Sequence, residues 1–155
     1  MARIALDTNV LVYAEGVERH PDDRRKVALS QAIIRGLTRG AGWSAAVQTL
    51  AELHAVLVRH ARRTPHAATL SVRQLALSCT VVPTPAEAFD DALTLAADHR
   101  IQIYDAIIVV AAAEAGAELL LTEDLHDGFM WRGVTVTNPF RQLPDARITP
   151  LLSTK

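Results

Sequence analysis

Residues 4–11 read Ile4-Ala5-Leu6-Asp7-Thr8-Asn9-Val10-Leu11, and this stretch decides how the chain folds. The apolar residues before Asp7 predict a short buried strand, and Val10 begins a helix that ends near Gly16. A strand that passes directly into a helix is the first step of an α/β fold. Asp7 is therefore expected at the carboxyl end of a strand, where open parallel sheets bind their ligands.

The rest of the chain repeats this alternation of short strands and helices. Further strands are predicted at residues 43–47, 80–82, 119–121 and 134–137, and further helices begin near residues 21, 48, 65, 86 and 106. Strands joined by helical crossovers form parallel sheets that are covered on both faces. We therefore expect an α/β fold with a mainly parallel sheet of about five strands.

Composition is typical of one globular domain. The 155 residues are 50% hydrophobic and 21% charged with a net charge of −1, which argues against disorder and against a strong general attraction for polyanions. Cys79 is the only cysteine, which excludes a disulfide framework. The longest apolar run, residues 106–113, is too short to cross a membrane, and the amino terminus does not resemble a signal peptide, so a cytoplasmic protein is expected.

We predict that the domain covers residues 1–140. The remaining residues, 141–155, contain Pro144 and Pro150 and show no clear periodicity. This tail is expected either to be loose or to dock on a partner.

Four carboxylates occupy positions where a strand gives way to a helix or where a helix begins. They are Asp7, Glu52, Asp105 and Asp124, and no Lys or Arg stands next to any of them in the sequence. If they converge, their like charges raise one another's pKa values or recruit a metal ion. A hard divalent cation such as Mg²⁺ or Mn²⁺ prefers oxygen ligands and commonly serves phosphate chemistry.

Each acid also has a structural explanation, which for Asp124 is a turn that either its side chain or that of Thr122 could hold. Asp7 and Asp105 could cap the helices that follow them. Residues 49–52, like residues 84–87, match the capping box, in which a Thr caps the helix and a Glu three residues later reaches back to it. The set of four at equivalent junctions, rather than any one acid, favours a functional site.

The motifs around these acids resemble the signature of PIN-domain proteins, and in particular of the VapC-type ribonuclease toxins of toxin–antitoxin pairs. The resemblance extends from Ile4 to about Phe140, and the matching stretches are residues 4–11, Glu52 at the start of a helix, residues 104–106 and residues 121–125.

The resemblance implies a three-layer α/β/α sandwich and a Mg²⁺- or Mn²⁺-dependent endoribonuclease, and thus an RNA substrate. It assigns the metal to Asp7, Asp105 and Asp124, places Glu52 in the same pocket, and makes Asn9 and Thr122 polar supports of that pocket. It also implies a homodimer and a small antitoxin protein that inserts a segment near the site.

Two details are left open by the sequence. Either Glu52 or Asp124 could orient the attacking water. Glu123 and Asp127 are spare acids nearby, and either of them, or neither, could serve a second metal ion.

Other functions remain in competition with the nuclease. A phosphotransfer enzyme could use Asp7 as a nucleophile, but the related phosphatases need an acid at position 9 and a Lys near a late strand; the chain has Asn9 and no Lys between Lys26 and Lys155. A non-catalytic binding module could use the same acids to receive an Arg from a partner. A housekeeping PIN nuclease without an antitoxin would carry the same motifs as a toxin.

Overall fold

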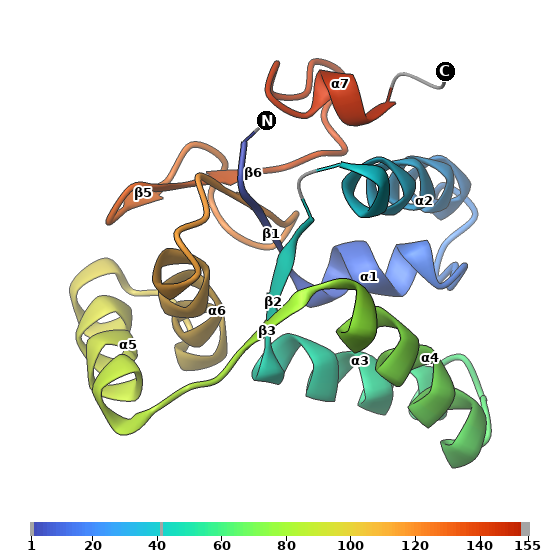
Figure 1. Cartoon of the computed structure of the whole chain (residues 1–155), viewed down its shortest axis with the longest axis horizontal. Coiled ribbons are helices and arrows are strands. Elements are labelled where there is room, and N and C mark those ends of the chain that lie inside the picture. Colours follow the sequence, from blue (N-terminus) through green and yellow to red (C-terminus); the bar gives the residue numbers. More distant parts are fainter. Residues whose placement is uncertain (1, 41, 153–155) are drawn as a thin grey trace.

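The computed structural model describes residues 2–40 and 42–152, which form a six-stranded sheet between two layers of helices (Figure 1). The strand order is β3-β2-β1-β4-β6-β5, and all neighbouring pairs are parallel except the antiparallel pair of β5 and β6. The strands are β1 (Ile4–Leu6), β2 (Ser44–Ala46), β3 (Thr80–Val82), β4 (Leu119–Leu121), β5 (Met130–Trp131) and β6 (Val134–Thr137). The predicted α/β class and mainly parallel sheet are confirmed, with one strand more than expected.

The helices divide between the two faces of the sheet (Figure 1). One layer contains α1 (Thr8–Ala14), α2 (Asp23–Arg39), α3 (Val47–Arg59), α4 (Pro65–Ser78) and the short α7 (Thr149–Leu152). The other layer contains α5 (Ala86–His99) and α6 (Ile103–Glu114). The molecule is therefore the three-layer α/β/α sandwich that the resemblance implied.

The residues of β1 are all apolar, without alternating polar residues, because both faces of the strand are covered. Successive side chains of a strand point to opposite faces, so a strand that is covered on both faces needs apolar residues throughout. Ile4 and Leu6 pack into the core beneath α1–α4, whereas Ala5 packs into the core beneath α5 and α6. The backbone N–H of Asp7 still donates to the carbonyl of Leu121 on β4 at 3.1 Å, which fixes the end of β1 beside the end of β4.

Several predicted helix boundaries were wrong by a few residues. Helix α3 follows β2 with no intervening loop and begins at Val47, within one residue of the predicted start, but it ends at Arg59 and not near residue 63 as predicted. Helix α6 begins at Ile103, so Asp105 lies inside its first turn instead of preceding it.

Both predicted capping boxes are wrong. Pro85 occupies the cap position of α5, and no side chain caps that helix. Because α3 begins at Val47, Thr49 and Glu52 both lie inside it, and Thr49 is fully buried. Glu52 is therefore free of the structural role that the capping box offered.

The edge strand β5 was not predicted. It pairs with β6 through a tight turn in which Arg132 and Gly133 both have positive φ angles of 43° and 87°. A two-residue hairpin turn of this kind needs positive φ at both central residues, so Gly133 was the signal in the sequence that could have revealed it.

The described part of the tail, residues 141–152, packs against α2, and its side chains Ile148 and Leu151 are 0% and 5% exposed. Gly36 permits this contact, because a Cβ atom at that position would lie only 2.6 Å from the carbonyl oxygen of Leu151. The domain boundary at residue 140 stays a prediction, and residues 153–155 lie outside the described part of the chain.

This close approach predicts the effect of Gly36→Ala. Alanine is the better helix former by about 1 kcal/mol, but overpacking costs about 1–3 kcal/mol, and here the obstructing atoms are backbone. We expect a net loss of up to about 2 kcal/mol in the free energy of unfolding, measured by urea denaturation. A stabilised variant would show that the tail does not pack on α2 in solution.

Candidate active site

Asp7 lies at the centre of a hydrogen-bond network at the carboxyl edge of the sheet. Its Oδ1 accepts from the backbone N–H of Thr8 at 2.6 Å, which makes Asp7 the N-cap of α1. Its Oδ2 accepts from the Thr122 hydroxyl at 2.6 Å and from the Asn9 amide at 3.1 Å. Asp7 is only 4% exposed, so these hydrogen bonds hold it in one orientation. Its role as a helix cap is therefore compatible with a role in the site.

Asn9 and Thr122 connect Asp7 to Asp124. The amide nitrogen of Asn9 lies 3.0 Å from both the Thr122 hydroxyl oxygen and Oδ2 of Asp124. The backbone N–H of Asp124 in turn donates to the Thr122 hydroxyl oxygen at 3.1 Å. The two residues that were expected to support the pocket thus contact the acids directly.

Glu52 reaches the same place from the second turn of α3. Its Oε2 accepts from the Thr8 hydroxyl at 2.8 Å, and its Oε1 accepts from the Gln48 amide at 2.7 Å. Sequence reasoning missed both donors as site residues. Thr8 stands next to Asp7, and Gln48 precedes Glu52 by one helical turn, so the spacing of four residues was the available signal.

Asp105 completes the set from the first turn of α6, on the opposite face of the sheet from α1 and α3. Burial raises its pKa, and the charges of Asp124 and Glu52 raise it further. All four predicted acids are therefore brought close enough for their charges to interact, from elements that are far apart in the sequence.

The pKa of Asp7 is raised from 3.8 to about 6, chiefly by burial. Hydrogen bonds from Thr122 and Thr8 oppose this shift, and the charges of Asp124 and Asp105 add to it. Among the described residues, no Lys or Arg forms an ion pair with any of the four acids. A cation from outside the chain would therefore relieve the repulsion.

The donor set fits a hydrated Mg²⁺ or Mn²⁺ ion. Within the described residues, no three His, Cys, Asp or Glu side chains form a ready-made metal cage. Mg²⁺ does not need one, since it keeps several waters and binds one or two carboxylates directly. The buried Oδ1 of Asn9 has no hydrogen-bond partner, so an acceptor for a metal-bound water is already in place.

The two spare acids are engaged elsewhere. Glu123 accepts hydrogen bonds from Tyr13 and Lys26, and Asp127 accepts from the backbone N–H of Asn138 and from the side chain of Arg141. Each of the two therefore already has a cationic partner in the chain, Lys26 for Glu123 and Arg141 for Asp127.

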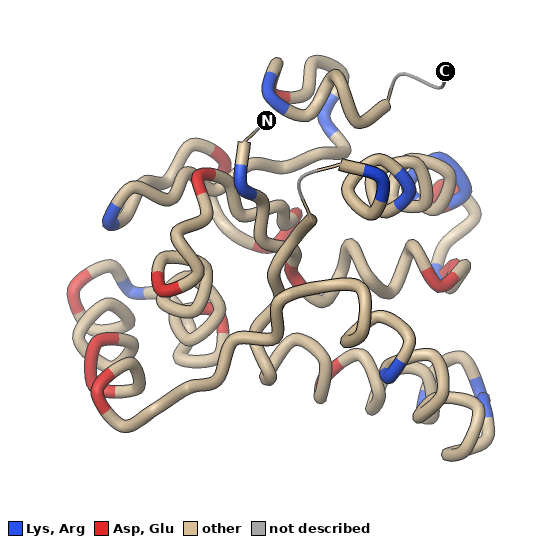
Figure 2. Tube along the Cα trace, viewed as in Figure 1, with Lys and Arg blue, Asp and Glu red and all other residues tan. Residues whose placement is uncertain are grey.

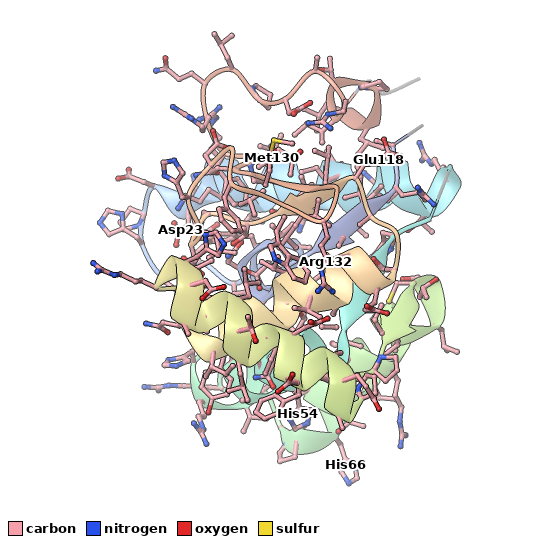
Figure 3. The ribbon with its side chains drawn as sticks, turned by 90° about the vertical axis from the view of Figure 1, so that its left-hand side faces the viewer. Asp23, His54, His66, Glu118, Met130 and Arg132 are labelled. Carbon is pink, nitrogen blue, oxygen red and sulfur yellow. The ribbon has the colours of Figure 1, made fainter. Side chains whose placement is uncertain are left out.

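The histidines of α3 and α4 are not part of this site. His54 lies 3.2 Å from the Thr69 hydroxyl and so links α3 to α4. Figure 3 shows His54 and His66 at the same end of the molecule, well apart from Asp23.

The family model of the PIN domain matches residues 4–126, a span that contains all four acids. The chain belongs to the PIN domain family. Comparison with curated protein sequences gives no significant match.

Solved structures support the fold of this PIN domain. A toxin–antitoxin complex from Klebsiella pneumoniae is similar with a TM-score of 0.60 and 15% identity, over 85% of this chain and 95% of the other. VapBC2 from Rickettsia felis, solved with a DNA fragment from its promoter, has a TM-score of 0.60 and 17% identity, over 86% of this chain and 96% of the other. VapC20 from Mycobacterium tuberculosis, described as a sarcin–ricin loop cleaving toxin, has a TM-score of 0.53 and 18% identity, over 76% of this chain and 86% of the other. At these identities the likeness establishes the fold.

No helix in the described part of this PIN domain is both long and apolar enough to span a bilayer.

The raised pKa of Asp7 predicts how the stability of the metal-free protein depends on pH. The protonated form is favoured by folding, so the contribution of Asp7 to stability is complete below pH 3.8 and is lost as the pH rises through about 6. The shift from 3.8 to about 6 corresponds to about 3 kcal/mol of unfolding free energy. We expect wild type in EDTA to become more stable between pH 7.5 and pH 5, and Asp7→Asn to show a smaller gain, because only Asp105, whose pKa is also raised, still contributes one of the same sign.

Urea denaturation at a series of pH values checks the prediction, with Asp90→Asn on the exposed surface of α5 as the matched control. The control should keep the wild-type profile. If Asp7→Asn also kept it across this window, the assigned shift would be wrong.

Proposed function

We propose that this PIN domain is a Mg²⁺- or Mn²⁺-dependent endoribonuclease and the toxin of a toxin–antitoxin pair acting in the cytoplasm. The observation that carries the proposal is the convergence of Asp7, Glu52, Asp105 and Asp124 without a cationic partner among the described residues. Membership of the PIN family supports it, as do similar folds in toxin–antitoxin complexes and in a toxin described as cleaving the sarcin–ricin loop.

In this proposal Asp7, Asp105 and Asp124 hold the metal ion. When bound, the ion lowers the pKa of a coordinated water and offsets the charge that develops on the scissile phosphate. Asp7 is the most rigid of the three, because both of its oxygens accept hydrogen bonds from the chain.

The neighbouring residues orient the acids. Asn9 aligns Asp7 with Asp124 through its amide, and its unpartnered Oδ1 accepts from a water in the pocket. Thr8 and Gln48 hold Glu52, which remains able to contact a water because each carboxylate oxygen can accept two hydrogen bonds. Glu52 and Asp124 both remain candidates for orienting the attacking water.

Cleavage of a mixed RNA pool tests the nuclease. We expect purified wild type to cut with Mg²⁺ or Mn²⁺ and not with EDTA. Asp7→Asn should lose at least about a hundredfold in rate, because it removes a charged ligand of the metal. Asp90→Asn is the control and should cut like wild type.

The same assay separates the alternatives. Cutting that survives both EDTA and Asp7→Asn would overturn the proposal. A protein that neither cuts nor binds Mn²⁺ would instead be a binding module whose acids receive an Arg from a partner.

We propose that the antitoxin covers this pocket and supplies a basic group to it. Co-expression with a candidate partner should give a complex that does not cut RNA. The absence of any partner, with full nuclease activity, would favour a housekeeping PIN nuclease.

We also propose a homodimer formed along the free edge of β3. This edge lies between α4 and α5 (Figure 1), and nearby on α4 the side chains Leu70 and Leu77 are 61% and 89% exposed. Helix α5 carries four acids and no Lys or Arg, whereas the only charged side chain of α4 is Arg73, so contact of α5 of one copy with α4 of the other would bring opposite charges together. Figure 2 shows the acidic residues gathered on α5.

Leu77→Glu tests this interface. Placing a charge among the exposed leucines should convert the dimer into a monomer, because a buried unpaired carboxylate is costly at an interface. Light scattering after gel filtration gives the mass, and Leu143→Glu at a distant exposed leucine is the control. A dimer that persists in Leu77→Glu would place the interface elsewhere.

A further inference from the structure

Glu123 stands between the pocket residues Thr122 and Asp124, but its own carboxylate is bound by the helices of one layer. The Tyr13 hydroxyl on α1 donates to Oε1 at 2.6 Å, and Nζ of Lys26 on α2 donates to Oε2 at 2.7 Å. Lys26 also donates to the Tyr13 hydroxyl at 3.2 Å. The three side chains therefore form a closed triangle of hydrogen bonds.

Lys26 is held from more than one direction. Its Nζ lies 5.1 Å and 5.6 Å from the ring centroids of Tyr13 and Phe140, which pack edge to face at 5.3 Å. Its Nζ also lies 3.7 Å from the carboxylate of Asp23. An exposed lysine pair contributes little because the side chain loses conformational freedom, whereas here the two rings and two carboxylates restrict the ammonium group together.

The segment of residues 122–124 is thus fixed in two places. Thr122 is anchored in the pocket by its hydrogen bond to Asp7, and Glu123 is anchored to α1 and α2. Asp124 is the exposed member of the segment, and within the described part of the chain its carboxylate accepts one hydrogen bond, from the amide of Asn9. The backbone position of Asp124 therefore depends on the anchoring of Thr122 and Glu123.

We propose that Tyr13 and Lys26 are positioning residues that act through Glu123 to hold the Asp124 carboxylate at the acidic pocket. Neither side chain contacts that carboxylate, so their effect passes through the backbone of residues 122–124. The part of the proposal that concerns metal binding rests on the proposed function, whereas the ordering of the segment does not.

The test uses substitutions that preserve shape and remove charge. Lys26→Met keeps the aliphatic chain between the two rings, and Lys26→Arg keeps the cation. Glu123→Gln removes the acceptor charge, and the double variant Lys26→Met with Glu123→Gln completes a cycle. Arg132→Met is the control, since it breaks an ion pair with Asp91 on α5, and in Figure 3 Arg132 lies apart from Asp23, which neighbours Lys26.

Amide hydrogen exchange in metal-free protein is the first readout. We expect Lys26→Met to speed exchange of the Asp124 amide about tenfold while the Leu120 amide in the central strand is unchanged, because a local opening does not require global unfolding. Lys26→Arg should restore most of the protection. Unchanged exchange at Asp124, or equal acceleration at Leu120, would overturn the proposal, the latter because it indicates general destabilisation.

Mn²⁺ affinity, measured without RNA, is the second readout. We expect Lys26→Met and Glu123→Gln each to weaken binding about tenfold, the usual effect of losing support behind a metal ligand. The double variant should be no weaker than either single variant, because both act through one contact, and Arg132→Met should bind like wild type.

The two readouts separate the two proposals. If wild type binds Mn²⁺ and Lys26→Met binds it equally well, the positioning role is wrong and the nuclease stands. If wild type binds no Mn²⁺, the proposed metal site is wrong, and the exchange of the Asp124 amide still decides whether Lys26 orders the segment.

Discussion

The burial of a carboxylate at the end of β1 is the constraint on which the rest of the site depends. Asp7 is excluded from water between two neighbouring strands, so its charge must be met by donors from the chain or by an external cation. The donors come from Thr8, Asn9 and Thr122. These hydrogen bonds hold the Asp7 carboxylate in place but do not neutralise its charge. The charges of Asp124 and Asp105 then raise the pKa of Asp7 further, and that of Glu52 raises the pKa of Asp105.

The sheet makes this arrangement possible because its central strands are buried on both faces. β1 and β4 are neighbours, so Asp7 and Asp124 leave the sheet side by side, while α3 and α6 bring Glu52 and Asp105 from opposite layers. A site built from both layers and from the sheet is held at fixed geometry by the packing of the whole domain. The ordering of Glu123 by α1 and α2 extends this support to the segment that carries Asp124.

Sequence patterns predicted the strands and helices whose formation depends on the residues of the segment itself. The short apolar runs identified β1 and β4, because a strand that is covered on both faces must be apolar throughout. The strands predicted at residues 43–47, 80–82 and 134–137 correspond to β2, β3 and β6. The patterns did not predict that α6 begins at Ile103, since strand pairing and helix packing fix that boundary, and the capping pattern at residues 49–52 was misleading because both of its polar residues lie inside α3. Thr8 and Gln48 were missed for a similar reason: a polar side chain near a helix start acquires its role only when a distant acid meets it.

The order of the strands has a consequence for the timing of folding. β1 is the first strand of the chain, yet it pairs with β4, and the hydrogen bond from Thr122 to Asp7 joins residues 115 positions apart. Contacts of such long range form late, because a large loop must close before they stabilise anything. During synthesis Asp7 is made long before Asp124. A nascent chain that ends before residue 124 therefore has no complete pocket. If the pocket cuts RNA as proposed, the protein becomes active only after most of it has been made.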